Sequence, residues 1–254
     1  MSPNSTPFSG RTALITGSTG GLGVAIAAMF AAAGAAVVIS GRDAARGQAV
    51  VDDIESAGGT AVFVTADLAR GEAEIRRVAA VATDAAGGRI DVLVNNAATL
   101  LMPTPTADIT EQVLADAFAV NVFAPFLLTG VIAPQMVRGG GGAIVNIGSI
   151  TGLRGAAGSA VYSGTKAVIG SFTKSWADEY GPHGVRVNAV APGPIATERQ
   201  VEFADHVAPM LARIPSRRMS TPAEVAAAVA FLAGDDAANI HGVILGVDGG
   251  WAAV

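Results

Sequence analysis

Short runs of β-branched and aliphatic residues alternate along the chain with longer Ala-rich stretches. The short runs are apolar on both faces and cover residues 12–16, 36–40, 61–65, 90–94, 143–147, 185–190 and 243–247. Unbroken apolar runs are typical of parallel strands covered by helices on both sides. The longer stretches, which we predict to be those helices, lie at residues 22–33, 43–57, 71–86, 110–137, 160–180 and 222–233. This order predicts a single α/β domain over residues 1–254, built on a doubly wound, parallel, seven-stranded sheet with helices on both faces.

Local signals mark where several elements begin and end. Residues 221–224 (Thr-Pro-Ala-Glu) have the pattern of a capping box with Pro at the first helical position, and residues 108–111 offer a similar start. Residues 1–9 are expected to form a flexible tail. Residues 191–220 are the least regular segment and follow the sixth strand. Because an open sheet binds ligands beyond the carboxyl ends of its strands, residues 191–220 are the candidate substrate lid.

Composition narrows the class of protein. The chain has 254 residues, a net charge of −5 and no cysteine. A mildly acidic chain lacks the basic face that nucleic acid or an anionic membrane would require. Disulfides and thiolate catalysis are excluded, and no basic stretch followed by an apolar run indicates a secretory signal. No apolar segment of membrane-spanning length is free of Gly, Pro or charged residues. We therefore expect a cytoplasmic protein with no nucleic-acid or membrane partner.

A glycine-rich turn, residues 16–23 (Thr-Gly-Ser-Thr-Gly-Gly-Leu-Gly), joins the first strand to the first helix. Glycines let the backbone approach a pyrophosphate there, and the helix N-terminus offers N–H donors and partial positive charge. A plain turn is the alternative, but the position in a βαβ unit favours a dinucleotide and a Rossmann arrangement. The second strand ends Ser-Gly-Arg-Asp at residues 40–43. Arg42 suits a 2′-phosphate, which favours NADP(H) over NAD(H). Otherwise Arg42 is an ordinary exposed cation and Asp43 a helix cap.

The chain contains two tyrosines and two lysines, and Tyr162 and Lys166 are four residues apart. On a helix these two side chains share a face. A free phenol has a pKa of about 10, and an adjacent ammonium is expected to lower it. Such a phenol can donate a proton to a nascent alkoxide or take one from an alcohol. A half-buried Tyr beside a solvated Lys is the structural alternative. Upstream, Ser149 ends a strand, where its hydroxyl could bond a substrate oxygen or simply make a turn.

With these motifs in order, the sequence resembles the short-chain dehydrogenase/reductase family, in its branch of roughly 250-residue chains. The resemblance covers about residues 11–251. Besides the glycine turn, Ser149 and the Tyr–Lys pair, it rests on Asp67, residues 95–98 (Asn-Asn-Ala-Ala), Asn121, Pro192-Gly193 and residues 247–250 (Val-Asp-Gly-Gly). It implies a nicotinamide cofactor and a homotetramer.

The resemblance also implies a role for each matching residue. Tyr162 is the general acid in carbonyl reduction and the base in alcohol oxidation, and Lys166 holds the nicotinamide ribose. Ser149 orients the substrate oxygen, and Asn121 positions a water that relays protons. The cofactor contacts it implies are Gly17, Ser18, Thr19, Gly21, Leu22, Gly23, Arg42, Asp67, Leu68, Asn95, Ala97, Tyr162, Lys166, Pro192, Gly193, Ile195 and Thr197.

The sequence departs from the family pattern in three places, one of which is His241, where Thr is commoner before the final strand. Ala98 replaces the usual Gly of the Asn-Asn-Ala-Gly motif, a change that we expect to be tolerated. Thr19 and Gly20 lack the basic residue that some NADP(H)-preferring relatives carry, so Arg42 would hold a 2′-phosphate largely alone. The three histidines, His183, His206 and His241, do not have metal-ligand spacing, and no metal is expected.

A ketone or secondary alcohol with a hydrophobic body is the expected substrate. The apolar residues that suggest it are Leu100, Leu101 and Met102 after the fourth strand and Val201, Phe203, Val207, Met210 and Leu211 in the lid. The lid residues could instead pack onto the body, and Arg154 could meet an anionic substrate or be simply exposed. A 3-oxoacyl thioester and a sugar alcohol remain open.

Other classes of protein fit less well. A catalytically idle, cofactor-sensing binding protein is the main alternative, and the intact Ser149, Tyr162 and Lys166 count against it. Sugar-nucleotide epimerase and dehydratase relatives use longer chains and a different glycine spacing. Enoyl reductase relatives separate Tyr and Lys by six residues rather than three.

Overall fold

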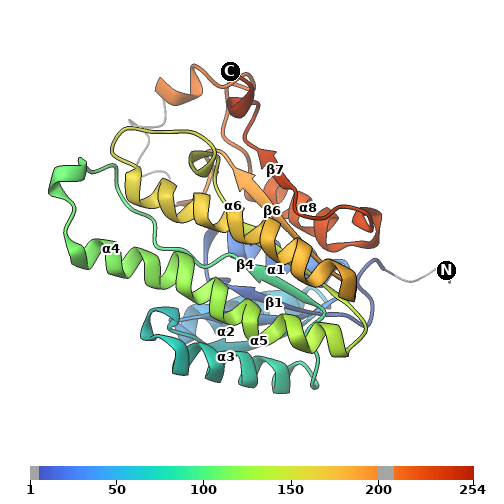
Figure 1. The fold of residues 1–254 in the computed structure, drawn as a ribbon. Coiled ribbons are helices and arrows are strands. Elements are labelled where there is room, and N and C mark those ends of the chain that lie inside the picture. Colours follow the sequence, from blue (N-terminus) through green and yellow to red (C-terminus); the bar gives the residue numbers. More distant parts are fainter. Residues whose placement is uncertain (1–5, 199–208) are drawn as a thin grey trace.

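A fully parallel, seven-stranded sheet forms the centre of the molecule (Figure 1). The structure, a computed structural model, describes residues 6–198 and 209–254. The strand order is β3-β2-β1-β4-β5-β6-β7. The strands are β1 (Thr12–Thr16), β2 (Ala36–Gly41), β3 (Thr60–Thr65), β4 (Val92–Asn95), β5 (Gly142–Ile147), β6 (Val185–Pro192) and β7 (Ile244–Val247). The predicted doubly wound sheet is confirmed.

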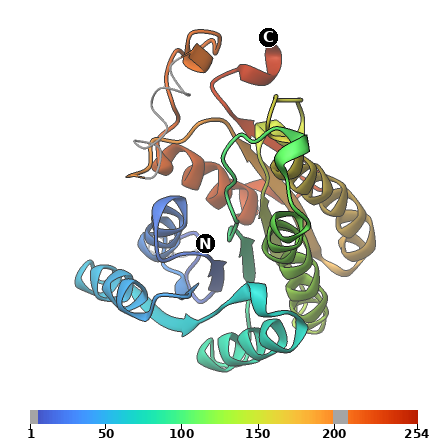
Figure 2. The same cartoon turned by 90° about the vertical axis from the view of Figure 1, so that its left-hand side faces the viewer.

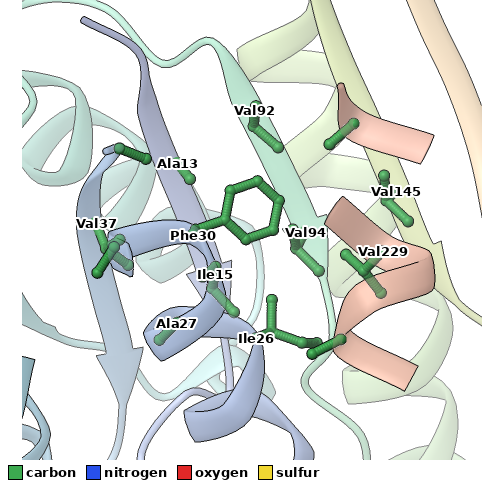
Figure 3. Close-up of a cluster of buried hydrophobic side chains, with 14 of the residues drawn as sticks. Ala13, Ile15, Ile26, Ala27, Phe30, Val37, Val92, Val94, Val145 and Val229 are labelled. Carbon is green, nitrogen blue, oxygen red and sulfur yellow. The ribbon is translucent and has the colours of Figure 1, made fainter. Parts of the chain in front are cut away.

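Helices cover both faces of the sheet, as Figure 2 shows from the side. One face carries α1 (Gly21–Ala32), α2 (Ala44–Ser56) and α8 (Pro222–Ala233). The other carries α3 (Glu72–Ala85), α5 (Ala124–Arg138) and α6 (Ala160–Tyr180), with α4 (Glu111–Phe118) leading into α5. In the first layer, Ile26 and Phe30 of α1 pack against Ile15, Val94 and Val229 (Figure 3). These side chains remove apolar surface from water between sheet and helices, which fixes the strand ends that build the site.

Side chains cap the first N–H groups of α8 and α2, but no side chain caps those of α1. Thr221 and Glu224 form the predicted capping box of α8. The Thr221 backbone N–H donates to the Glu224 carboxylate, and the Glu224 backbone N–H donates to the Thr221 hydroxyl. Asp43 caps α2 by accepting from the Arg46 backbone N–H at 3.0 Å. The N-cap of α1 is Gly20, with no side-chain cap bond and no acidic residue in the first turn. The first N–H groups of α1 are therefore left for an anion from outside the helix.

The single helix predicted over residues 110–137 is wrong in one respect. A π-helical turn, η3 (Ala119–Phe123), separates α4 from α5. A hydrophobic period cannot reveal one inserted residue, because the apolar stripe resumes on both sides of it. Asn121, a predicted catalytic residue, lies in this turn and is only 2 % exposed. π turns occur often at functional sites, which agrees with the position of Asn121.

The same stretch, Glu111–Arg138, has the length and apolar composition of a membrane-crossing helix, with a hydropathy of 1.8 in its most apolar window. Half of that window is buried inside the molecule, and the core helix of a soluble protein meets the same two criteria. Pro125, Gly130 and Pro134 interrupt its sequence.

The N-terminal segment also differs from expectation. Residues 1–9 were expected to be a flexible tail, but Phe8 is 2 % exposed and stacks on Phe30 with ring centroids 4.7 Å apart. Its backbone N–H donates to Ala33 O at 2.9 Å. Phe8 therefore packs against the end of α1, because its aromatic side chain finds a core position that a count of polar residues does not reveal, while residues 1–5 lie outside the described residues.

Candidate active site

The site lies at the carboxyl edge of the sheet, where β1 and β4 are neighbours. Chain connections leave these two strands toward opposite faces, which opens a crevice for ligands. Gly17 follows β1 with φ +64°, and a Cβ there would lie 2.8 Å from the Ala97 Cα. The glycine turn and the loop after β4 therefore touch, and a side chain at position 17 would push them apart.

Asn96 holds this junction. Its Nδ2 donates to Thr16 O at 2.8 Å and to Gly17 O at 3.0 Å. The Thr16 hydroxyl accepts from the backbone N–H groups of Asn96 and Ala97 at 2.9 and 3.0 Å. Asn96 belongs to the Asn-Asn-Ala-Ala motif but was not predicted as a site residue. Its position beside two predicted cofactor residues was the signal for this supporting role.

The start of α1 fits a dinucleotide pyrophosphate. A Cβ on Gly20 would meet nothing within 4 Å, and Gly21 has φ +52°. The uncapped N–H groups of α1 thus border open space, which is the donor chemistry that phosphate oxygens need. Thr197 lies alongside, since a Cβ on Gly21 would be 3.7 Å from its Cγ2.

Some predicted cofactor residues use their side chains elsewhere. Ser18 is fully buried, donating to Ile15 O at 2.7 Å and accepting from Ser40 N at 2.9 Å. Leu22 and Leu68 are buried, and a Cβ on Gly23 would collide with Gly17 O. Any contact of Ser18 with a cofactor is therefore left to its backbone.

Asn95 also points away from the crevice. Its amide donates to Asn146 Oδ1 at 2.9 Å and to the Thr129 hydroxyl at 3.3 Å, inside the molecule. Asp67 is half-buried, and its carboxylate caps the turn after β3 through Ala69 N at 3.3 Å. The predicted cofactor contact of Asn95 therefore falls to its backbone, because its side chain ties β4 to β5.

Arg42 borders an open hollow of about 570 Å³ that it shares with Thr19, Asp43 and Arg46. A Cβ on Gly41 would lie 2.6 Å from the Thr19 Cγ2, so this glycine allows the two segments to approach. Arg46 was not predicted as a site residue. It lies four positions after Arg42 in the first turn of α2, a spacing visible in the sequence, and its Nε is 3.6 Å from Asp43. Two cations therefore border the hollow.

The segment after β6 reaches toward the glycine turn. Because β6 runs to Pro192, the irregular segment begins later than the expected residue 191. Gly193 donates to Val247 O at 3.1 Å, and Ile195 forms a bridge with Ser220. Residues 209–220 and the C-terminal turn lie at the same end of the molecule in Figures 1 and 2, and Ser216 N donates to Gly249 O at 3.0 Å. The expected lid residues Val201, Phe203 and Val207, like His206, lie outside the described residues.

Tyr162 and Lys166 lie one turn apart on α6. Lys166 is 5 % exposed, and its Nζ donates to Ile147 O at 2.8 Å. The same Nζ is 5.7 Å from the Tyr162 ring centroid. Tyr162 reaches the surface with part of its side chain, and Ser149 is the neighbouring side chain that lowers the pKa of its phenol group. Three of the four predicted catalytic side chains are thus gathered at the end of β5 and the start of α6.

The pKa values of this pair differ from the expectation. Burial raises the pKa of Tyr162 to about 12, and the hydrogen bond from Ser149 only partly opposes that shift. Burial lowers the pKa of Lys166 to about 8. The expected lowering of the Tyr162 pKa by Lys166 is not found, because the pKa of Lys166 lies below that of Tyr162 and the lysine has lost its charge before the phenol ionises. Ser149 is the group that favours the phenolate here.

Asn121 connects the loop after β4 to α6. Its Oδ1 accepts from Thr99 N at 2.7 Å, and its Nδ2 donates to Thr99 O at 3.1 Å and to the Thr165 hydroxyl at 3.2 Å. Thr165 precedes Lys166 and was not predicted as a site residue. Asn121 therefore reaches the catalytic helix through Thr165, and its role in holding a water stays a prediction.

Two loops and the C-terminus border the outer side of the site. Leu100, Met102 and Leu153 are 44, 46 and 51 % exposed. The two loops that carry them meet where Thr104 N donates to Gly158 O at 2.8 Å. Arg154 is half-buried rather than exposed. Its guanidinium bonds the carbonyl of Trp251 and lies 5.6 Å from that ring's centroid.

Comparisons with known proteins show the family of this chain. A family model described as "Enoyl-(Acyl carrier protein) reductase" matches residues 17–252. The 3-oxoacyl-[acyl-carrier-protein] reductase FabG of Vibrio cholerae is 38 % identical, over 95 % of this chain and 97 % of that protein. The cis-4-hydroxycyclohexanecarboxylate dehydrogenase of Sinomonas cyclohexanicum is 39 % identical, over 97 % of this chain and 98 % of that protein.

Solved structures indicate the same family. A structure from Beutenbergia cavernae, described as a candidate NAD(P)-dependent gluconate 5-dehydrogenase with NADP bound at low occupancy, is 37 % identical with a TM-score of 0.90. The match covers 98 % of this chain and 100 % of that chain. The Tyr162–Lys166 spacing differs from that of enoyl reductases, so the family-model match indicates kinship rather than that activity. The chain belongs to the short-chain dehydrogenase/reductase family and is an oxidoreductase of its NAD(P)-dependent alcohol–ketone class.

Proposed function

We propose that this enzyme reduces a ketone to a secondary alcohol, or the reverse, with Tyr162 as the general acid and base and with NADP(H) preferred over NAD(H). The observation that carries the proposal is the gathering of Ser149, Tyr162 and buried Lys166 at one strand end beside the uncapped start of α1. When bound, the nicotinamide supplies or accepts the hydride. The chain supplies the proton that must accompany it.

Each catalytic side chain has a distinct task at the substrate oxygen. In reduction, the Tyr162 phenol donates its proton to the oxygen, and in oxidation the phenolate takes it back. Ser149 hydrogen-bonds the same oxygen and orients it. Lys166 keeps positive charge under the phenol below about pH 8 and holds the cofactor ribose. Asn121 positions the water that returns protons to solvent.

The cofactor preference rests on the two cations at the end of β2. Arg42 and Arg46 border the hollow where the 2′-phosphate of NADP(H) would lie, and a guanidinium is well suited to phosphate oxygens. The residues proposed to hold the rest of the cofactor are Gly17, Ser18, Thr19, Gly21, Leu22, Gly23, Asp67, Leu68, Asn95, Ala97, Tyr162, Lys166, Pro192, Gly193, Ile195 and Thr197. The structural relative that was solved with NADP supports this preference.

A hydrophobic body is proposed for the substrate. Leu100, Met102 and Leu153 present apolar side chains beside the catalytic residues, and burying such side chains against a ligand is favourable. Arg154 is held by Trp251, which reduces its availability for a substrate anion. A 3-oxoacyl thioester is the second candidate, favoured by the similarity to FabG.

A substrate panel tests the proposal directly. Cyclic and linear ketones, their secondary alcohols, a 3-oxoacyl thioester and a sugar alcohol are assayed with NADPH or NADP⁺ and with NADH or NAD⁺. We expect turnover of hydrophobic ketones and alcohols, with a higher kcat/KM for the phosphorylated cofactor. Tight cofactor binding without turnover of any compound would instead favour the cofactor-sensing protein.

Arg42→Ala in the same assays isolates the phosphate contact. Loss of a charge-assisted bond to phosphate is expected to raise the KM for NADPH by roughly ten- to a hundredfold, with that for NADH changed less than about twofold. Arg138→Ala, an exposed arginine at the end of α5, is the matched control. An equal change in both KM values would contradict a 2′-phosphate site at Arg42.

We also propose a cytoplasmic homotetramer. Phe123 and Phe126 are 56 and 48 % exposed, and Phe126 continues into an aromatic cluster with Phe172 and Trp176. Exposed apolar surface of this kind marks an interface. Size-exclusion chromatography with light scattering is expected to give four times the 25.2 kDa chain mass, and a monomeric mass would contradict it. A chain without cysteine suits the reducing cytoplasm.

A further inference from the structure

The hydroxyl of Ser149 has one proton and two lone pairs to share among its neighbours. Its oxygen accepts from Thr151 N at 3.2 Å. It also lies 3.0 Å from the Thr151 hydroxyl, where the donor can be either group. In the proposed function, Ser149 donates its single proton to the substrate oxygen.

The number of protons that Ser149 can donate determines the direction of the bond between the Ser149 and Thr151 hydroxyls. If Ser149 donates to the substrate oxygen, the bond between the two hydroxyls must run from Thr151 to Ser149. Within residues 6–198 and 209–254, the Thr151 hydroxyl has no hydrogen-bond partner other than Ser149, so Ser149 is the one acceptor for its proton among these residues. A hydroxyl that accepts two bonds becomes a better donor, since hydrogen bonds in a chain polarise one another.

The turn that carries Thr151 is held firmly against the catalytic helix. Ile150 is 2 % exposed, which anchors the turn η4 (Ile150–Gly152) in the protein interior. A Cβ on Gly152 would lie 2.8 Å from the Lys166 carbonyl carbon and 3.0 Å from Ala167 N. The absence of a side chain at position 152 thus lets the turn lie directly on α6. Thr151 is therefore fixed relative to both Ser149 and the residues of α6.

We propose that Thr151 is a positioning residue, whose hydroxyl donates to Ser149 and so directs the Ser149 proton toward the substrate oxygen. This inference rests on the proposed function of the same site. Thr151 touches neither reacting atom and acts only through Ser149. Without its hydroxyl, Ser149 retains the bond from Thr151 N but can turn its proton elsewhere.

Thr151→Val and Thr151→Ser test the proposal, because valine keeps the shape and serine keeps the hydroxyl. Loss of one hydrogen bond predicts a roughly two- to tenfold fall in kcat for Thr151→Val, while Thr151→Ser stays within about twofold of wild type. In a Ser149→Ala background, Thr151→Val should cause no further loss, since the group through which it acts is gone. Equal losses in both Thr151 variants, or a full additional loss without Ser149, would overturn the proposal.

A spectroscopic arm needs no turnover. Tyr180→Phe leaves Tyr162 as the one tyrosine of the chain, so tyrosine labelled with ¹³C at Cζ gives one NMR signal from the phenol. Thr151→Val should move this signal, Thr151→Ser should restore it, and Thr151→Val should leave it unmoved when Ser149 is Ala. The proposal would be overturned, even if the enzyme turns over, by a signal that Thr151→Val does not move. It would also be overturned if Thr151→Val moves the signal equally when Ser149 is Ala. A wild-type enzyme inactive on every substrate would refute the proposed function and leave this arm to decide the role of Thr151.

Discussion

Tyr162→Phe is expected to lower kcat by about 10²–10⁴-fold while cofactor affinity changes less than about threefold. The substitution removes only the oxygen that donates or accepts the proton. At neutral pH the wild-type phenol is protonated, because burial raises its pKa to about 12, so reduction loses a ready donor. Turnover in both directions and binding of each cofactor by calorimetry give the two numbers.

The other tyrosine of the chain provides the control. Tyr180 ends α6, eighteen residues or about 27 Å of helix beyond Tyr162. Tyr180→Phe is expected to keep kcat within about twofold of wild type. Normal turnover in Tyr162→Phe, with Tyr180→Phe also normal, would remove Tyr162 from the catalytic assignment.

Lys166→Met is expected to lower kcat/KM by about a hundredfold or more and to change how stability depends on pH. Activity falls because the charge beneath the phenol and the ribose contact are both lost. The pH effect follows from burial, which lowers the pKa of Lys166 from 10.5 to about 8. Between these values the folded protein has released a proton that the unfolded chain keeps. The free energy of unfolding of wild type therefore rises with pH across this window, by about 3 kcal/mol at most.

Methionine at position 166 cannot titrate, so this rise is absent in the variant. Urea unfolding at pH 7.5 and at pH 10.5 is expected to show wild type gaining stability relative to Lys166→Met between the two conditions. Lys174→Met removes the other lysine, which is exposed, and should follow wild type at both pH values. An identical pH dependence in Lys166→Met and wild type would mean that Lys166 is not desolvated in the folded protein.

The sheet could be predicted from sequence because parallel buried strands are apolar runs, and the helices followed from the stretches between them, except for the π turn that divides residues 110–137. The functional motifs were equally local, since the glycine turn, Ser149 and the Tyr162–Lys166 spacing are fixed by neighbours in the chain. Arg46 could also have been found, because it lies one helical turn beyond Arg42.

Other features depend on contacts between distant segments. The burial of Phe8 needs Phe30, and the tie between Asn121 and Thr165 spans 44 positions. The raised pKa of Tyr162 could not be predicted from the nearby lysine alone, because desolvation depends on the whole fold around the phenol. The hydroxyl contact of Thr151 depends on the shape of one short turn, which hydrophobic patterning does not determine.

The π turn at residues 119–123 links two parts of the molecule that otherwise have separate tasks. Each residue of an α-helix turns the chain by about 100°, so deletion of one residue from this turn would rotate either α4 or α5 by that amount. Asn121 would then leave the catalytic helix, or the face carrying Phe126 would turn away from its aromatic neighbours. An insertion or deletion in this turn would therefore disturb either the contact of Asn121 with the catalytic helix or the position of Phe126 among its aromatic neighbours. Substitutions, which leave the helical phase unchanged, avoid this rotation.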